Sequence, residues 1–496
     1  MVVVGAGMGG LAVAARLSAQ GHDVTVVEQS SRVGGKLETY RRDGFAFDTG
    51  PSLLTLPAVY RDLFLKTAVR RKDAALEDNV DLHGLSTAFR HRWADGTAAV
   101  LPGSNSNRVA AALGDALGGS AEADWQRFSR RAADIWTVTR TPFLESPVSG
   151  LRDLRRHLRS AHAVRTVVPW QTLHRLARQH FSDSRLVTLV DRYATYAGSD
   201  PRRAPAALAV IPFVEQTFGA WHVGGGLGAL ADALHARCLE RDITFRLDTA
   251  VRAITTTGDA VSGVELASGE HLHADIVVSD ADAESLYGRL LRHPASSGQL
   301  RGITRRPRSL SGFVLLLALE GRSDGMQHHN VFFPHRYAGE FDAIFGHSPH
   351  PPDDPAIYVC RPDDDAMRPS GTEAWFVLVN TPSHDPEHGV DWRDQSLVDA
   401  YRDTILARLA ERGVDVRDHI RWSEVRTPAD IADRTWSPGG AIYGSATNGR
   451  RAALSRPANR SPVDGLFLVG GSTHPGGGLP LVGMSAAIVA DLIGDA

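Results

Sequence analysis

The start of the chain is the feature that most constrains its fold. Residues 1–4 are a short apolar run, and residues 5–10 follow with the sequence GAGMGG, which has the spacing GxGxxG. Residues 11–20 show the apolar period of a helix, and residues 24–27 form a second apolar run. A strand, a glycine turn, a helix and another strand in this order predict the β-α-β unit of a nucleotide-binding parallel sheet.

Each glycine of the turn would have a physical role beside a dinucleotide. Gly5 permits the tight turn, Gly7 lets backbone N–H groups approach a diphosphate, and Gly10 lets the helix pack closely against the strand. Glu28 follows the second apolar run, where a carboxylate can accept hydrogen bonds from ribose hydroxyls. The pattern predicts a dinucleotide without choosing between FAD and NAD, and a glycine turn with no ligand is the alternative.

The composition excludes several other functions. Lys and Arg number 54 and Asp and Glu 57, so the formal net charge of −3 excludes a strongly basic surface for nucleic acid. Cys238 and Cys360 are the only cysteines, which argues against a disulfide framework and a thiolate metal site. The histidines are scattered, and the pair His328-His329 lacks the placement of metal ligands, so we expect no metal site.

The rest of the pattern has α/β segments at both ends and a helical block between them. Apolar runs typical of strands return at residues 243–247, 261–266, 276–278, 311–319, 374–379 and 465–469. Helical signals dominate residues 105–215, 397–409 and 480–493, and residues 90–101 have the pattern of a hairpin with Asp95–Gly96 at its turn. The uncharged stretches 1–15 and 465–490 lack a basic start or are interrupted by glycine and proline, so no spanning segment or secretory leader is expected.

Five further segments carry a family resemblance. They are residues 32–36 (RVGGK), 47–57 (FDTGPSLLTLP), 196–201 (YAGSDP), 219–226 (GAWHVGGG) and 470–480 (GGSTHPGGGLP). Together with the N-terminal unit they resemble the phytoene-desaturase-like carotenoid oxidoreductases, within the amine-oxidase-like flavoproteins. The resemblance spans nearly the whole chain and is loose over residues 60–190 and 290–430.

The resemblance implies FAD as cofactor and a particular α/β fold. A Rossmann-type FAD-binding domain would be assembled from both chain ends, with a mixed-sheet substrate domain and a helical subdomain that acts as a lid or faces a membrane. The expected boundaries are 1–75, 222–285 and 435–496 for the FAD-binding domain, 76–104 and 286–434 for the substrate domain, and 105–221 for the helical subdomain.

The same resemblance implies FAD contacts residue by residue. The expected contacts are Gly5, Ala6, Gly7, Met8, Gly9, Gly10, Glu28, Gly34, Gly35, Lys36, Gly50, Pro51, Ser52, Val251, Gly470, Gly471, Gly478, Leu479 and Met484. Val251 matches a position whose backbone receives adenine in this family. Lys36 stands where the family usually has arginine, so the charge is kept but the bidentate fork is lost. His474 lies in a glycine-proline turn and is expected to shape the flavin loop rather than carry a proton.

Three residues are candidates for catalysis. Asp153 and Arg156 lie in a segment that resembles one in which an acid and an arginine three residues on are acid/base partners. Positions i and i+3 share a helix face, so Arg156 would hold Asp153 ionised and ready to accept a proton. An exposed ion pair with no catalytic part is the alternative. Glu215, just upstream of residues 219–226, is a further candidate base.

The implied reaction is desaturation of a long apolar polyene, such as a carotenoid precursor. Hydride would pass from an allylic C–H to flavin N5, a proton would leave the adjacent carbon, and oxygen or a quinone would reoxidise the flavin. The alternatives are a dehydrogenase or isomerase that acts on a carrier-bound polyene, and a lipid-binding escort protein without flavin. We expect a cytoplasmic protein that meets the inner face of the membrane through the apolar-basic segment 151–168, or else takes its substrate from a carrier protein.

Overall fold

A parallel sheet of five strands contains segments from both ends of the chain. The computed structural model describes residues 1–148, 161–449, 452 and 456–496. The strands lie in the order β10-β2-β1-β14-β20, and every neighbouring pair is parallel. Their bounds are β1 Val2–Val4, β2 Thr25–Val27, β10 Thr244–Arg246, β14 Val277–Ser279 and β20 Leu466–Leu468. The first and last strands of the sequence therefore lie on either side of β14.

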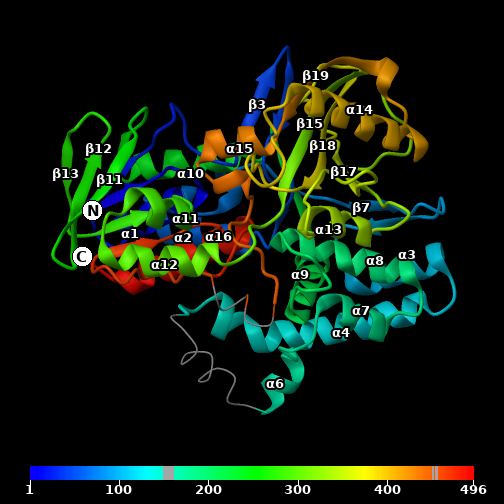
Figure 1. The fold of residues 1–496 in the computed structure, drawn as a ribbon, viewed down its shortest axis with the longest axis horizontal. Coiled ribbons are helices and arrows are strands. Elements are labelled where there is room, and N and C mark those ends of the chain that lie inside the picture. Colours follow the sequence, from blue (N-terminus) through cyan, green and yellow to red (C-terminus); the bar gives the residue numbers. More distant parts are fainter. Residues whose placement is uncertain (149–160, 450–451, 453–455) are drawn as a thin grey trace.

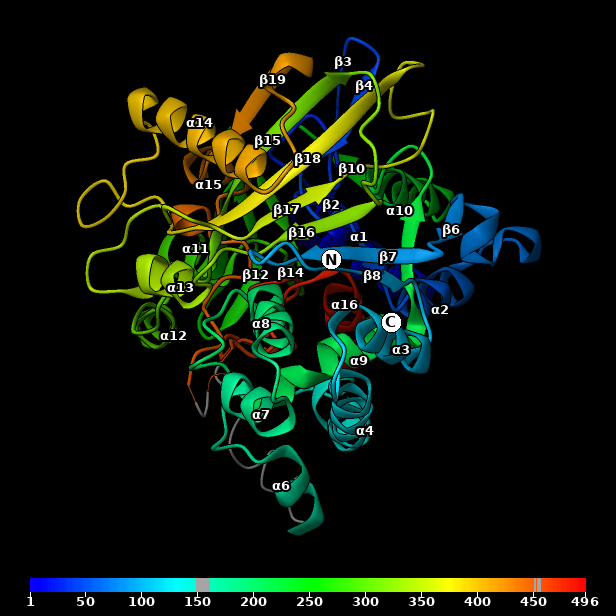
Figure 2. The ribbon, with the colours of Figure 1, turned by 90° about the vertical axis from the view of Figure 1, so that its right-hand side faces the viewer.

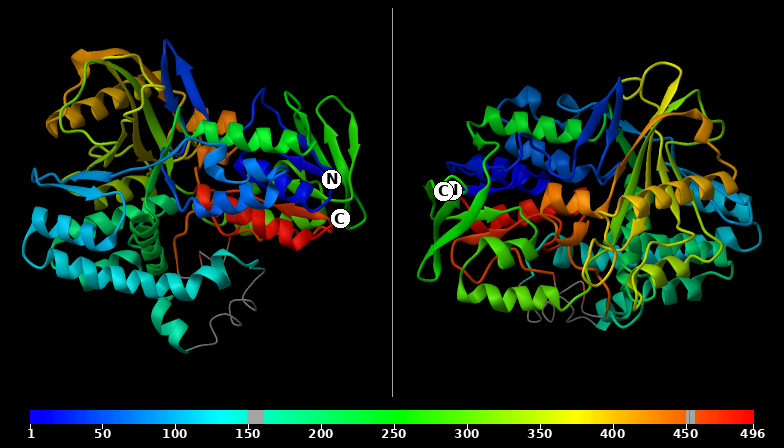
Figure 3. Two further views of the ribbon diagram at one scale, coloured as in Figure 1. Left: turned by 180° about the vertical axis from the view of Figure 1, so that it is seen from behind. Right: turned by 45° about the horizontal axis from the view of Figure 1, so that its top comes forward.

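Both faces of this sheet are buried, which explains the continuous apolar runs of its strands. Val3 packs into a core with α1 (Met8–Ala19), α10 (Gly228–Glu240) and α16 (Leu479–Ile493). Val2 packs into a second core on the other face. That core includes residues of an antiparallel sheet made of β11 Val251–Thr257, β12 Ala260–Leu266 and β13 His271–His273. Figures 1 and 3 show the two termini side by side at the outer end of this part of the molecule.

The second large sheet has seven strands in the order β19-β15-β18-β17-β16-β7-β8. Only β16 and β7 pair in parallel, and the other neighbouring pairs are antiparallel. The bounds are β7 Thr87–Arg92, β8 Ala98–Pro102, β15 Ser311–Glu320, β16 His329–Phe332, β17 Ile357–Cys360, β18 Thr372–Thr381 and β19 Ile420–Arg426. Helix α14 (Gln395–Glu411) covers one face, where Ile405 packs in a core with Phe313 and Trp375 (Figure 2).

A block of helices packs below β7, β8 and β16 (Figure 2). It contains α3 Ser106–Leu117, α4 Ala121–Thr139, α6 Ala161–Val167, α7 Leu173–His180, α8 Ser184–Arg192 and α9 Val210–Phe218, with short 3-10 or π turns at Arg140–Leu144, Tyr193–Ala197 and Ala206–Ala209. Trp125 and Phe128 of α4 are buried in the same core as Phe89 of β7. The block therefore shares its core with the second sheet.

Smaller elements connect these parts. The strands are β3 Thr39–Arg42 paired with β4 Phe45–Asp48, and β5 Leu54–Thr55, β9 Ala220–Val223 and β6 Leu82–Gly84 in the order β5-β9-β6. The helices are α2 Ala58–Thr67, α11 Ala283–Ser285, α12 Pro294–Thr304, α13 Ala338–Phe345 and α15 Pro428–Thr435. Short 3-10 or π turns lie at Arg71–Asp73, Leu76–Asp78, Leu286–Leu290, Arg417–His419 and Pro438–Gly440.

The fold confirms the expected α/β class and the assembly of the parallel sheet from both chain ends. The hairpin around Asp95–Gly96 and the terminal helix are present at the expected places. The expectations lack strands β3, β4, β5, β6, β9, β11, β13, β16, β17 and β19, because short or mixed polar-apolar runs become strands only through pairing. The three domain boundaries stay a prediction. Among the described residues, no helix is both long and apolar enough to cross a bilayer.

Candidate active site

A cavity of about 840 Å³ lies where the parallel sheet, the second sheet and the helical block meet. Val4, Val27 and Gly470 bring to it the carboxyl ends of parallel strands, the edge at which open α/β sheets bind ligands. Phe376 of the second sheet and Val214 of the helical block line it further along. All three parts of the fold therefore contribute to one site.

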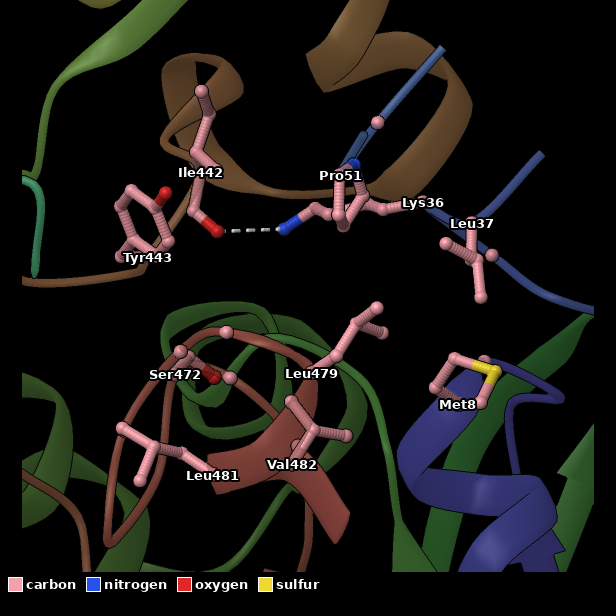
Figure 4. A pocket seen from close by; sticks show the side chains of 18 of the residues that line it. Met8, Lys36, Leu37, Pro51, Ile442, Tyr443, Ser472, Leu479, Leu481 and Val482 are labelled. Carbon is pink, nitrogen blue, oxygen red and sulfur yellow. Dashed lines mark hydrogen bonds between the residues drawn. The ribbon is translucent and has the colours of Figure 1, made fainter. Parts of the chain in front are cut away.

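Figure 4 shows two segments far apart in the sequence facing each other across this cavity. Lys36 and Pro51 lie on one side, and Leu479, at the start of α16, lies on the other. Lys36 Nζ donates a hydrogen bond to the carbonyl oxygen of Ile442 at 3.3 Å. The side chain is accessible from the cavity, but desolvation by the surrounding protein lowers the pKa of Lys36, and two nearby carboxylates oppose this shift.

The glycine turn packs directly against the loop that follows β2. The Gly34 N–H donates to the Ala6 carbonyl oxygen at 2.8 Å, which holds the two backbones together. Gly35 has φ +59°, and a Cβ there would stand 3.1 Å from the Gly7 Cα. Only residues without a side chain allow this approach, so bare backbone lines the cavity at the start of α1.

Glu28 lies at the end of β2 with its carboxylate against the glycine turn. Its Oε2 accepts a hydrogen bond from the Ala6 N–H at 2.7 Å, and its Oε1 accepts from the Ser30 N–H at 2.9 Å. These bonds orient the carboxylate in the cavity wall and leave further lone pairs for ribose hydroxyls.

The C-terminal glycine loop forms the opposite wall of the cavity. Helix α16 begins after Gly478, which has φ +104° and offers no capping side chain. Arg456 Nη1 donates to the carbonyl oxygens of Tyr443 at 2.9 Å and Gly471 at 3.1 Å. Burial lowers the pKa of Arg456 to about 10. This half-buried guanidinium therefore fixes the loop by backbone contacts.

His474 supports the same loop from behind and is not among the residues that line the cavity. Its Nε2 lies 3.0 Å from the Ser146 carbonyl oxygen, and its ring packs edge-on against Phe143. Burial lowers the pKa of His474 to about 4, so the ring is neutral at physiological pH. These contacts support a role in shaping the loop, which stays a prediction.

Asp280 places an unexpected carboxyl group at the glycine turn. It follows β14 directly, and a Cβ added to Gly7, Gly9 or Gly470 would meet its carboxylate oxygens. Burial raises the pKa of Asp280 to about 7, although the Gly10 N–H favours the charged form. The carboxyl group thus lies at the N-terminus of α1, a position that suits an anion.

Glu215 of α9 forms part of the cavity wall in the helical block. Its Oε1 accepts a hydrogen bond from Tyr193 Oη at 2.6 Å, and its Oε2 makes no hydrogen bond with any described residue. Burial raises the pKa of Glu215 to about 7, while Tyr193 and Arg192 favour the charged form. A carboxyl group that titrates near neutrality in an apolar cavity is suited to accept a proton.

Most residues expected to bind the cofactor line this one cavity. They are Gly5, Gly7, Met8, Gly9, Glu28, Gly34, Gly35, Lys36, Gly50, Pro51, Ser52, Val251, Gly470, Gly471, Gly478, Leu479 and Met484. Ala6 and Gly10 lie behind the turn, where a Cβ on Gly10 would overlap the Gly5 carbonyl oxygen. Asp153 and Arg156 lie outside the described residues. The role of each residue toward FAD or in catalysis stays a prediction.

Comparisons with known proteins agree over almost the whole chain. The sequence model of the flavin containing amine oxidoreductases matches residues 8–493. The chain is 33% identical to 4,4'-diapolycopene oxygenase of Methylomonas sp., over 99% of this chain and 97% of that one. This chain belongs to the flavin-containing amine oxidoreductase family. It is therefore a flavoenzyme with FAD as cofactor, which sets aside the escort protein without flavin.

Two further relatives are each 32% identical to this flavoenzyme. Each alignment covers 99% of this chain and 93% of the relative. They are the hydroxyneurosporene desaturase of Rubrivivax gelatinosus and the zeta-carotene-forming phytoene desaturase of Myxococcus xanthus. Among solved structures, an oxidoreductase from Methanosarcina mazei superposes with a TM-score of 0.63 at 15% identity, over 99% of both chains. Cyclohexylamine oxidase from Brevibacterium oxydans superposes with a TM-score of 0.61 at 15% identity, over 99% of this chain and 98% of that one. These two structures support the fold only.

The residues of the cavity fit FAD. The glycine turn, the start of α1 and Glu28 suit a diphosphate and a ribose, as the GxGxxG pattern predicts. The bare backbone at Gly35 and Gly478 leaves room on both walls that a side chain would fill. Both chain ends contribute backbone groups that can hydrogen-bond to FAD. Lys36 adds a positive charge on the side of the cavity opposite Leu479.

Several residues of the site are absent from the sequence expectations, and four polar ones stand out. Asp280, Arg192, Tyr443 and Arg456 line the cavity, but none of them belongs to a local motif. One signal could have found Asp280, because it follows an apolar strand just as Glu28 does. Carboxyl ends of parallel strands meet at one edge of a sheet, so acids in this position gather at the ligand site.

Proposed function

We propose that this flavoenzyme is a desaturase that introduces double bonds into a long apolar polyene such as a carotenoid precursor. The proposal is carried by the apolar extension of the cavity beyond the glycine turns. The helical side contributes Trp136, Phe143, Leu144, Val210, Ile211 and Val214, and the sheet side contributes Phe89, Val314, Val331, Ala356, Phe376 and Leu378. An extended wall of this kind suits a hydrocarbon chain, because it removes apolar surface from water.

The relatives support oxidation at carbon–carbon bonds. The similar proteins of Rubrivivax gelatinosus and Myxococcus xanthus are desaturases by name, and both match this chain over almost their full length. Amine oxidation, the activity named for the family, has less support because the similar solved structures share only 14 to 15% of their residues with this chain.

FAD, when bound, supplies the hydride acceptor for such a reaction. The protein then has to hold an allylic C–H in place, exclude water and accept the proton that leaves the neighbouring carbon. The apolar walls position the chain and keep water out. Lys36 and the two glycine loops hold the cofactor end of the cavity.

Glu215 is the described residue best placed to accept the proton. Its Oε2 is buried without a hydrogen-bond partner among the described residues, and Tyr193 fixes the other carboxylate oxygen. Above a pH of about 7 the ionised Oε2 can take the proton in the apolar wall. Asp153 and Arg156 are the alternative acid/base pair.

The substrate and the electrons need partners outside the chain. We propose that oxygen or a quinone reoxidises the cofactor.

We also propose that the protein is cytoplasmic and that its helical block contacts the inner face of the membrane. Val164 and Val167 of the apolar-basic segment lie on α6 and are half-buried. Sedimentation with anionic liposomes at low salt tests this contact. A protein that stays in the supernatant would contradict membrane contact and favour a carrier protein.

Anaerobic mixing of the FAD-loaded enzyme with candidate polyenes tests the function. We expect the flavin absorption to bleach and the polyene spectrum to move to longer wavelength as conjugation grows. Bleaching by amines but not by polyenes would contradict the proposal. Bleaching only by a polyene bound to a carrier protein would favour the natural-product alternative, and a change of double-bond geometry without bleaching would indicate an isomerase.

A further inference from the structure

A guanidinium group lies inside the apolar part of the cavity. Arg192 is the last residue of α8, is only 7% exposed and lines the cavity. Arginine keeps its charge at every physiological pH. Because a charge withdrawn from water is costly unless it is paired, a buried arginine in an apolar wall needs a compensating group.

Neighbouring arginines of the helical block have such a group. Arg185 pairs with Asp183 at 2.7 Å, and Arg202 pairs with Asp200 at 2.8 Å. Within the part of the chain that the structure describes, no carboxylate forms a direct ion pair with Arg192, although Glu215 and Glu340 interact with it electrostatically. Arg192 is also the least exposed of the three, since it is buried whereas Arg185 and Arg202 are half-buried.

Among the described residues, the contacts of Arg192 leave most of its N–H donors without a hydrogen bond. Its Nη1 donates one hydrogen bond to Tyr196 Oη at 2.8 Å. Its Cζ lies 5.3 Å from the ring centre of Phe89, 5.1 Å from that of Tyr196 and 5.7 Å from that of Tyr358. Aromatic faces attract a cation, but they accept none of the remaining N–H bonds in a directed way.

A second unused donor belongs to the same wall. Tyr337 lines the cavity, interacts electrostatically with Arg192, and its hydroxyl makes no hydrogen bond with any described residue. The neighbouring lining residues Val331 and Ala356 are apolar. Glu215 also lines the cavity and interacts electrostatically with Arg192, but it accepts no hydrogen bond from Arg192 or Tyr337 among the described residues. These donors are therefore available to an acceptor that a ligand brings.

We propose that Arg192 and Tyr337 bind an oxygen atom at one end of the substrate, so that the enzyme prefers polyenes with a hydroxyl, carbonyl or carboxyl oxygen near one terminus. The inference rests on the proposed function and names its substrate class. An oxygen acceptor gains a charge-assisted hydrogen bond in a site without water. A hydrocarbon end of the same length leaves the buried donors unpaired, which is the basis of strong discrimination.

The test compares two polyenes that have equal length and conjugation and differ only in a terminal hydroxyl group. For the wild type we expect kcat/KM for anaerobic flavin reduction to be about 100-fold higher with the hydroxylated polyene. Arg192→Met keeps the length of the side chain and removes the donors. It should lower kcat/KM about 100-fold for the hydroxylated polyene only. Arg175→Met on the exposed face of α7 is the matched control and should change neither value.

The outcomes separate this inference from the proposed function. If neither polyene reduces the wild-type flavin, the proposed function fails. If both reduce it equally well, or Arg192→Met affects both equally, the function stands and this inference is wrong. Loss of bound FAD in Arg192→Met would instead assign the guanidinium to the cofactor and overturn the inference. Should Arg192→Met not fold, binding of the two polyenes to the wild type, followed by flavin quenching, decides the preference on its own.

Discussion

Tyr193 holds one oxygen of the Glu215 carboxylate, and the other oxygen has no partner among the described residues. The Tyr193 hydroxyl lies 2.6 Å from Oε1, and both side chains are buried. Oε2 has no hydrogen-bond partner among the described residues, and Glu215 lines the cavity. The pair joins the turn after α8 to α9, so the position of the carboxylate depends on how these two helical segments pack.

Replacing Glu215 by glutamine should slow the reaction without removing the cofactor. Glutamine keeps the shape of the side chain but cannot accept the proton, so flavin reduction by the substrate should slow about 100-fold. Stopped-flow absorbance under anaerobic conditions measures the rate. Glu340→Gln is a matched control, because Glu340 is also buried with its pKa raised to about 7, yet it does not line the cavity. A wild-type rate in Glu215→Gln would exclude Glu215 and direct the search to Asp153.

The same carboxyl group should make stability depend on pH. Burial raises the pKa of Glu215 from 4.5 to about 7, so the folded protein binds this proton more tightly than the unfolded chain. The stabilisation is fully present below the unfolded pKa and is lost as the pH rises through the folded value. The free energy of unfolding of the wild type should therefore fall relative to Glu215→Gln by about 1–3 kcal/mol between pH 5 and pH 8. Urea unfolding at the two pH values measures it, and a constant difference would contradict the burial.

Gly35→Ala should weaken FAD binding more than an alanine at another left-handed glycine. The added Cβ would stand 3.1 Å from the Gly7 Cα and push apart the two loops that line the cavity. Gly258→Ala in the β11–β12 turn is the control, since its φ of +61° is similar and no atom lies within 4 Å of the added Cβ. Both variants should lose about 1–2 kcal/mol of stability from backbone strain. Only Gly35→Ala should release FAD, as measured by flavin fluorescence after dilution.

Asp280→Asn should remove a pH dependence from FAD binding. In the wild type the Asp280 carboxyl lies at the glycine turn with its pKa raised to about 7, close to the charges of Glu28 and Lys36. An anionic diphosphate at the same turn disfavours ionised Asp280. FAD affinity should therefore fall as the pH rises through 7, by at most about tenfold per pH unit. Asparagine should abolish this slope, whereas Asp324→Asn at an exposed position should keep it. Equal slopes in the wild type and Asp280→Asn would assign the proton to another group.

The sequence by itself determined the parts of the protein that depend on local backbone geometry. The tight turn from a strand into a helix beside a diphosphate requires the glycines of GxGxxG, whatever the rest of the fold is. The position of Glu28 likewise depends only on the strand that it follows. The C-terminal glycine run could be assigned to the same site because a parallel sheet can recruit its strands from both ends of a chain. The sheet order β1-β14-β20 realises this arrangement.

Only the tertiary structure decided which polar residues face the cavity. Arg192 is one of 51 arginines, the 54 basic residues less three lysines, so its residue type says nothing about burial. Its environment is set by β7 and β17, whose Phe89 and Tyr358 lie about a hundred or more positions away in the sequence and meet it only in the folded chain. The same holds for the Glu215 oxygen that has no partner among the described residues, because burial and pairing are properties of packed elements and have no signature in the spacing of residues along one segment.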